Sequence, residues 1–325
     1  MDIKDNRFLV VGGAGLIGSH ICEALLKHDA KEVIVFDNFV RGSIENLELV
    51  KNDPRFKIFE MGGDILQPDL IEIALKNIDG VFHLSALWLL QCHELPSYAF
   101  DVNVKGTFNI LEACRKANIK KLVFSSSASV YGDAITEPIT EDHPFNNKNF
   151  YGATKICGES MLTAYHYRYQ LNFVGLRYMN VYGPRQDYRG AYIAVIMKML
   201  DAIDKNQSPI IYGDGDEAFD FIYVEDCAKA NICAMKSSSN NGFYNVGTGV
   251  KTSLKEIAEI LLKLTNSDLK IKYMPREQKT FVKNRIGCPK KASKEINFKY
   301  SVRLEDGLIK LLNWRKNHIL ESIKN

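Results

Sequence analysis

The amino-acid sequence lacks the features that mark secreted, membrane-spanning and nucleic-acid-binding proteins. Its seven cysteines include no C-x-x-C pair, and an odd number argues against a disulfide framework. No apolar run approaches the ~20 residues of a membrane span, and Met1–Asp5 contain no apolar signal core. The formal net charge of +3 is too small to predict nucleic-acid binding. We therefore expect a cytoplasmic protein that binds neither nucleic acid nor a membrane.

Internal repeats and low-complexity linkers are also absent from the sequence. Apolar residues make up 46% and charged residues 25% of the 325 residues, as in an ordinary globular protein. A chain of this length can bury the core of one large or two modest domains. The function must therefore be sought in local motifs.

A glycine-rich turn lies between a strand and a helix near the start of the chain. The apolar run Arg7–Val11 leads directly into Gly12, Gly15 and Gly18, and Leu16–Lys27 has helical periodicity. Strand, glycine turn and helix in this order indicate a dinucleotide site, with the pyrophosphate at the helix N-terminus. The spacing is G-x-x-G-x-x-G rather than G-x-G-x-x-G, and a tight turn without a ligand is the alternative.

The next predicted strand ends in an acidic residue. Glu32–Phe36 leads into Asp37, about twenty residues past the glycines, where an acid accepts the adenosine ribose hydroxyls. A carboxylate there repels a 2′-phosphate, so the pattern favours NAD over NADP. Arg41 is close enough to keep NADP open, and an ordinary turn aspartate is the other alternative.

Short apolar strands and amphipathic helices then alternate along the chain. We predict further strands at Lys57–Phe59, Gly80–Leu84, Lys121–Ser125 and Phe173–Arg177, and helices at Gln67–Lys76, Ser97–Ala117 and Asn149–Gln170. This alternation indicates an α/β fold with a doubly wound parallel sheet of the Rossmann type, in which ligands bind at the carboxyl ends of the strands.

From Tyr178 onward, proline and glycine residues break the pattern into short elements. Helices predicted at Tyr192–Asp204, Leu254–Leu264 and Leu304–Asn317 indicate a smaller C-terminal α/β domain. We expect residues 1–177 to form the NAD-binding domain, with segments near 219–247 returning to it, and residues 178–325 to form the substrate-binding domain.

Tyr151 and Lys155 lie four residues apart, after a strand that ends in Ser125, Ser126 and Ser127. On a helix, residues at this spacing share one face. A cation beside a phenol favours the phenolate and so lowers the pKa of the tyrosine, which normally titrates near ~10. The pair is therefore a candidate general base, and an ordinary surface pair is the alternative.

Together these motifs resemble the extended short-chain dehydrogenase/reductase family, and within it the nucleotide-sugar epimerase and dehydratase branch. The resemblance covers most of the chain and rests on eight blocks in order: Gly12–Gly18, Asp37, Asp64–Ile65, His83–Ala86, Asn103–Thr107, Ser125–Gly132, Tyr151–Lys155 and Arg177–Pro184. Eight ordered blocks make a chance resemblance implausible.

The resemblance implies NAD as the cofactor and a nucleotide sugar as the substrate. Tyr151 would act as the base, Lys155 would hold the nicotinamide ribose and Ser127 would hydrogen-bond the reacting oxygen. The implied cofactor contacts are Gly12, Gly15, Leu16, Ile17, Gly18, Asp37, Asn38, Asp64, Ile65, Leu84, Ser85, Ala86, Asn103, Lys155 and Tyr178. For Asp64 a turn cap is the alternative. The helices Ser97–Ala117 and Asn149–Gln170 resemble those through which family members form homodimers.

The residues that follow the active-site serine separate the reactions of this branch. Sugar 4,6-dehydratases carry an Asp and a Glu where this chain has Ala128 and Ser129, and decarboxylating relatives tend to keep the Glu. Epimerisation needs no further acid or base, so we predict 4-epimerisation of an NDP-hexose through a transient ketone. A dehydrogenase that releases a keto-sugar, an epimerase acting at another carbon and a non-catalytic cofactor-binding sensor are the alternatives.

Substrate contacts are predicted at Ser127, Asn180 and Arg276. A strand-end turn is the alternative for Asn180. Many relatives carry a pyrophosphate-binding Arg where this chain has Phe219. Arg276 matches a second pyrophosphate-binding Arg of the family. The missing Arg at position 219 could be replaced by one of the cations that follow, Lys279, Lys283 or Arg285. This basic cluster could equally be a solvated face of the protein.

Leu87–His93 is more apolar and bulkier than the corresponding stretch of relatives. Trp88 is a candidate pocket residue, with buried packing as the alternative. Cys92 and His93 have no partner at the spacing of a metal site, so we predict no metal and a structural role for the histidine.

Overall fold

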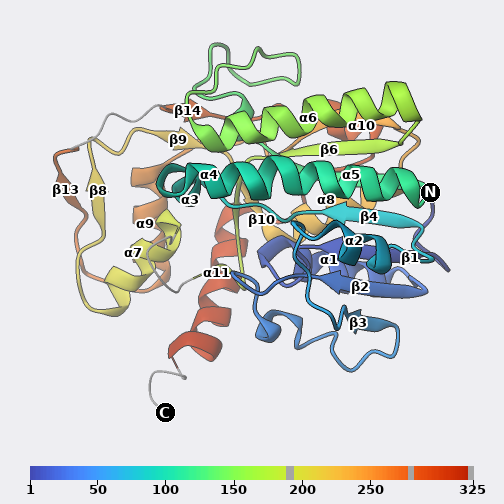
Figure 1. Ribbon diagram of the computed structural model, residues 1–325. Helices are drawn as coiled ribbons and strands as arrows, with labels where there is room; N and C mark the ends of the chain where they lie inside the picture. The colour runs from blue at the N-terminus through green and yellow to red at the C-terminus, as the bar shows by residue number, and fades with distance from the viewer. Residues whose placement is uncertain (188–193, 277–281, 321–325) are drawn as a thin grey trace.

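A parallel sheet of seven strands forms the centre of the protein, in the order β11-β6-β5-β4-β1-β2-β3 (Figure 1). The computed structural model describes residues 1–187, 194–276 and 282–320. The strands of this sheet are β1 (Arg7–Val11), β2 (Glu32–Phe36), β3 (Phe56–Ile58), β4 (Gly80–His83), β5 (Lys121–Ser127), β6 (Phe173–Tyr178) and β11 (Asn241–Val246). All neighbouring pairs run parallel, which confirms the predicted α/β class.

Helices cover both faces of the sheet, as the nearly continuous apolar runs of its strands require. On one face, α1 (Leu16–Lys27) and α8 (Val224–Lys236) pack onto a core that includes Phe8 and Val10. On the other, α2 (Pro68–Ala74), α5 (Thr107–Lys116) and α6 (Phe150–Tyr169) pack onto a core that includes Leu9 and Val11. Alternate residues of β1 thus point into opposite layers.

A long helical segment precedes β5. It comprises α3 (Leu89–Glu94), α4 (Pro96–Phe100), a π-helical turn (Asp101–Gly106) and α5. The sequence predicts one helix over Ser97–Ala117, and the π-helical turn interrupts it. Such turns are frequent at functional sites.

A smaller group of elements lies beside the large sheet (Figure 1). Its helices α7 (Val195–Asp204), α9 (Leu254–Leu264) and α11 (Leu304–Arg315) share a third apolar core with β10 (Phe221–Tyr223). The remaining short elements are β7 (Asn180–Tyr182), β8 (Ile210–Tyr212), β9 (Ala218–Phe219), β12 (Thr252–Ser253), β13 (Lys272–Met274), β14 (Asn284–Arg285), α10 (Lys290–Glu295), 3₁₀ turns at Ile44–Leu47 and Ala128–Val130, and a π-helical turn at Lys316–Leu320.

Several elements begin or end at residues other than those predicted from the sequence. The strand predicted at Lys57–Phe59 is Phe56–Ile58, and the helix predicted at Gln67–Lys76 is shorter at both ends. β5 continues to Ser127 because its last three residues pair with β6. The sequence did not identify α8. Of the segments near 219–247 that were expected to return to the first domain, β11 joins the seven-stranded sheet and α8 packs against its core, whereas β9 and β10 pair in smaller sheets. The division into two domains stays a prediction.

Within the described part of the chain, no helix is both long and apolar enough to cross a membrane. All seven cysteines are free thiols.

Candidate active site

The glycine turn brings backbone against backbone at the carboxyl end of β1. Gly12 has a φ of 81°, and a Cβ there would lie 2.8 Å from the backbone nitrogen of Ser85. A Cβ on Gly18 would lie 2.3 Å from the carbonyl oxygen of Gly12. Gly15 caps α1 without a side-chain hydrogen bond, which leaves the first-turn N–H groups to an anion. These N–H groups include those of Leu16 and Ile17.

Asp37 ties this turn to the end of β2. Its carboxylate oxygens accept the N–H of Ala14 at 2.9 Å and the N–H of Phe39 at 2.8 Å. Burial raises the pKa of Asp37, and the two backbone donors oppose that rise. Each oxygen keeps a further lone pair for a ligand hydroxyl. The guanidinium of Arg41 instead pairs with Asp187 at 2.9 Å and lies 5.0 Å from the ring centroid of Trp88.

The predicted cofactor residues after β2 and β3 are arranged as turns. Asn38 accepts the N–H of Val40 at 3.2 Å, and Asp64 accepts the N–H of Leu66 at 2.9 Å. Asp64 therefore has the turn-capping role that was its alternative. Ile65 is buried. A glycine turn too tight for a Cβ, an uncapped helix N-terminus and an acid beside them together fit a dinucleotide.

The loop after β4, residues 84–87, lies against this turn. Leu84 donates its N–H to the carbonyl of Val11 at 2.8 Å. Asn103, from the π-helical turn, accepts the N–H of Leu87 at 2.7 Å and donates to the Leu87 carbonyl at 2.9 Å and to Thr154 at 3.1 Å. Asn103 therefore positions the loop that carries Ser85 and Ala86, a role that the sequence did not reveal.

Tyr151, Lys155 and Ser127 come together where β5 meets the start of α6. Ser127 lies close enough to Tyr151 to lower the pKa of its hydroxyl, and the Oγ of Ser127 accepts the N–H of Ser129 at 3.1 Å. The Nζ of Lys155 donates to the carbonyl of Ser125 at 2.8 Å and lies 5.7 Å from the ring centroid of Tyr151. The predicted one-face geometry of the pair is thus present.

Burial shifts the pKa values of both members of the pair. Burial raises the pKa of Tyr151 to about 12, against the opposing effect of the Ser127 hydrogen bond. Burial also lowers the pKa of Lys155 to about 8. Desolvation is the largest influence on both groups, and it disfavours the charged form of each. The expectation that Lys155 lowers the pKa of the tyrosine stays a prediction.

Two local features hold α6 in place for this geometry. The helix begins after Asn149, whose side chain accepts the N–H of Gly152 at 2.8 Å. Gly158 faces the ring of Phe124, where a Cβ would lie 2.7 Å from the ring. Glycine here lets the helix approach β5 closely enough for Tyr151 to meet Ser127.

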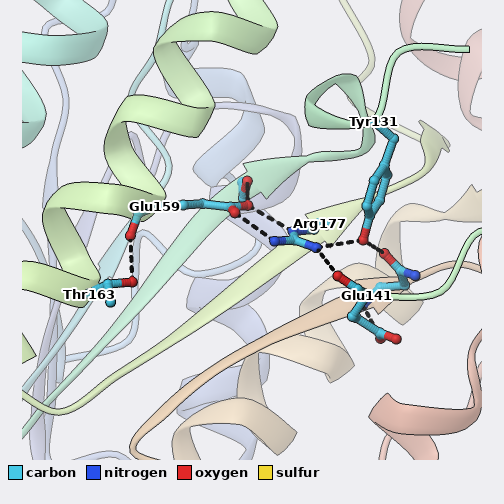
Figure 2. A network of polar contacts seen from close by, with 7 residues as sticks. Tyr131, Glu141, Glu159, Thr163 and Arg177 are labelled. Atoms are coloured by element: carbon cyan, nitrogen blue, oxygen red, sulfur yellow. Dashed lines mark hydrogen bonds and ion pairs between the residues drawn. The ribbon is translucent and has the colours of Figure 1, made fainter. Parts of the chain in front are cut away.

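A buried ion pair anchors the same helix to β6 (Figure 2). Arg177 donates to both carboxylate oxygens of Glu159, at 2.9 and 2.7 Å, and to the hydroxyl of Tyr131 at 2.7 Å. Ser126 donates to Glu159 at 2.5 Å, which includes β5 in the network. The side chains of Arg177 and Glu159 are only 5% and 4% exposed. Removing either one would therefore leave the other as a buried charge without compensation.

The predicted substrate residues are more dispersed. Asn180 is partly buried in β7, and Trp88 is partly buried at the start of α3. Arg276 donates to the Tyr212 carbonyl and forms an ion pair with Glu217. The hydroxyl of Tyr178 contacts Ser125 and Asn231 inside the core, so it is already engaged within the protein.

Of the cations predicted to compensate for Phe219, Arg285 lies beside it. Arg285 in β14 pairs with Phe219 in β9, and its guanidinium carbon is 6.0 Å from the ring centroid. Lys279 lies outside the described residues. The sequence named Arg285 as one of several candidates, but only the pairing of β9 with β14 singles it out.

The metal prediction concerned Cys92 and His93. Cys92 is buried with its thiol against Leu87, whereas His93 is exposed and so has no structural role in the core. In the described ranges, no group of three His, Cys, Asp or Glu side chains could hold a metal ion.

Comparisons with known proteins agree with this geometry. The model of the NAD dependent epimerase/dehydratase family matches residues 8–247. A putative UDP-glucose 4-epimerase from Methanocaldococcus jannaschii is 38% identical over 314 residues, which cover 95% of this chain and 98% of the relative. UDP-N-acetylglucosamine 4-epimerase from Methanobrevibacter ruminantium, solved with UDP-N-acetylmuramic acid, superposes with a TM-score of 0.91 at 37% identity, covering 97% of this chain and 100% of that one. UDP-glucose 4-epimerase from Thermus thermophilus, solved with NAD, gives a TM-score of 0.84 at 31% identity, covering 96% and 100%.

Proposed function

Because this chain belongs to the NAD-dependent epimerase/dehydratase family, we propose that it catalyses the 4-epimerisation of a nucleoside-diphosphate hexose. The resemblance to this family inferred from the motifs is confirmed, and its cofactor is NAD. The relatives described above that are named as 4-epimerases support the choice of reaction within the family.

The observation that carries the proposal is the absence of acid–base groups next to Ser127. Ala128 and Ser129 form a buried 3₁₀ turn, and neither side chain can protonate a leaving hydroxyl or remove a proton from carbon. Elimination of water therefore lacks its acid and its base at these positions. Transient oxidation needs only the groups already at the site.

In this mechanism, Tyr151 removes the proton of the C4 hydroxyl and later returns it, while Ser127 hydrogen-bonds the reacting oxygen. Lys155 supplies a positive charge beneath the phenol ring. Bound NAD supplies the acceptor and donor of hydride. The hexose must present its opposite face before hydride returns, which inverts C4.

The test is to incubate the purified protein and NAD with UDP-, GDP-, CDP- and dTDP-hexoses. We expect one C4 epimer pair to interconvert without net reduced nicotinamide, as followed by chromatography of the sugars and absorbance of the nicotinamide. A keto-sugar in equal amount to reduced nicotinamide would instead make the protein a dehydrogenase. A dehydrated product would contradict the interpretation of residues 128 and 129.

Homodimerisation and a cytoplasmic location stay predictions. Exposed aromatic residues on α4, α5 and α6, among them Phe100, Phe108 and Tyr169, support the predicted pairing of these helices with a second copy.

A further inference from the structure

Glu159 lies on the same face of α6 as Tyr151 and Lys155. The three residues follow one another at intervals of four, so their side chains form one row along the helix. Two members of this row bind neighbouring residues of β5. Lys155 donates to the carbonyl oxygen of Ser125 at 2.8 Å. Glu159 accepts the hydroxyl of Ser126 at 2.5 Å, and so holds the residue directly before the active-site serine.

The carboxylate of Glu159 is itself held firmly (Figure 2). Its residue is only 3% exposed, and Arg177 donates to both of its oxygens at 2.9 and 2.7 Å. The same guanidinium also donates to the hydroxyl of Tyr131 at 2.7 Å and to the carbonyl oxygen of Glu141 at 3.0 Å. A carboxylate shared among donors from several elements cannot shift without breaking one of these bonds.

The contacts of α6 with β5 differ in what they fix. A Cβ on Gly158 would lie 2.7 Å from the ring of Phe124, so glycine there allows the helix to approach the strand closely. Such a contact limits the approach, whereas a hydrogen bond is directional and fixes the position along the strand. Lys155 reaches its partner on a flexible stem. The bond between Ser126 and Glu159 therefore sets the register of α6 on β5.

We propose that Glu159 is a positioning residue for proton transfer: by holding Ser126 it fixes α6 along β5, and with it the hydroxyl of Tyr151 relative to the reacting oxygen. This rests on the proposed function only for the role of Tyr151 as the base. A displacement of about 1 Å at a reacting group can cost roughly 100-fold in rate. Glu159 thus acts on the rate without touching the substrate.

Ser126→Ala tests this, because it removes one hydrogen bond from Glu159 and leaves the ion pair with Arg177 in place. We expect kcat for a nucleotide hexose to fall roughly 10- to 100-fold, while KM and the affinity for NAD stay within about twofold. Ser126→Thr keeps the hydroxyl and should restore most of the rate.

The pH dependence of kcat gives a second readout. The Ser127 hydroxyl lowers the pKa of Tyr151, and a displaced helix would weaken this effect. The pKa of the base would then rise, so the acidic limb of the pH–rate profile should move to higher pH in Ser126→Ala. A role in stability alone would leave this limb unchanged.

Thr163→Ala is the matched control. The Thr163 hydroxyl donates to the carbonyl oxygen of Glu159 at 2.9 Å, so this change removes a hydrogen bond from the same residue but not from β5 (Figure 2). It should leave kcat, KM and the pH–rate profile unchanged. Equal rates in Ser126→Ala and Thr163→Ala would overturn the proposal. A loss of NAD affinity in step with kcat would also overturn it, because it would indicate general damage to the fold.

Crystal structures of the wild type and of Ser126→Ala test the positioning without turnover. We expect the separation between the Cα atoms of Tyr151 and Ser127 to change by about 0.5 Å or more, the tolerance within which a catalytic group must be held. An unchanged separation would overturn the proposal even if the rate falls. A wild type that interconverts no nucleotide hexose would instead contradict the epimerase proposal, and the two structures would still decide the role of Glu159.

Discussion

Replacing Tyr151 with phenylalanine is expected to lower turnover by roughly 10²- to 10⁴-fold, the usual contribution of a positioned general base. The substitution removes only the hydroxyl that Ser127 contacts and keeps the ring that packs against Leu87 and Cys92. Because Tyr151 is not part of the glycine turn, the affinity for NAD should change little. Steady-state rates and a fluorescence titration with NAD measure the two effects separately.

Tyr165→Phe is the matched control for this prediction. Tyr165 lies on the same helix, about 21 Å along its axis from Tyr151, and its hydroxyl donates to Glu112 at 2.6 Å. Its loss should leave the rate within about threefold, since a hydrogen bond to a carboxylate distant from the chemistry contributes mainly to stability. Full activity in Tyr151→Phe would refute the role of the phenol.

Removing the cation of the buried ion pair is expected to have the largest effect on stability. Arg177→Met leaves the carboxylate of Glu159 buried without its bidentate partner (Figure 2), and such changes cost about 3–5 kcal/mol. Replacing Glu159 with leucine in the same protein should recover part of this loss, because no uncompensated charge then remains. Urea unfolding followed by circular dichroism gives the free energy of unfolding.

The surface pair of Lys116 with Glu72 is the control for the buried pair. Its side chains are 54% and 43% exposed, so Lys116→Met should cost less than about 1 kcal/mol. If Arg177→Met were as mild as this control, the network would not be the anchor that holds α6 to β5 and β6.

The elements that were predicted best from the sequence are those with clear local signals at their ends. Helix α1 follows Gly15, and α9 begins at the capping box of Ser253 and Glu256, so both were predicted with the observed ends. Helix α8 has no side-chain cap, and the π-helical turn at Asp101–Gly106 leaves no local sequence signal. Both depend on tertiary contacts.

In the candidate site, too, the features with a local sequence signal were predicted, and those that depend on tertiary contacts were not. The spacing of Tyr151 and Lys155 predicted their shared face, but not the burial that raises the pKa of one and lowers that of the other. The glycines predicted the turn, since only they fit its close backbone contacts. Arg285 could not be selected by spacing, because its place beside Phe219 comes from the pairing of β9 with β14, which are distant in the sequence.

The most direct test of the central claim is the fate of hydrogen at C4. A nucleotide hexose that the protein interconverts is prepared with deuterium at C4 and is followed by NMR in ordinary water. Transient oxidation with return of the same hydride predicts that the product keeps its deuterium at C4 with inverted configuration, and that no reduced nicotinamide accumulates. Loss of the deuterium to solvent, or its retention in released reduced nicotinamide with a free ketone, would contradict the account.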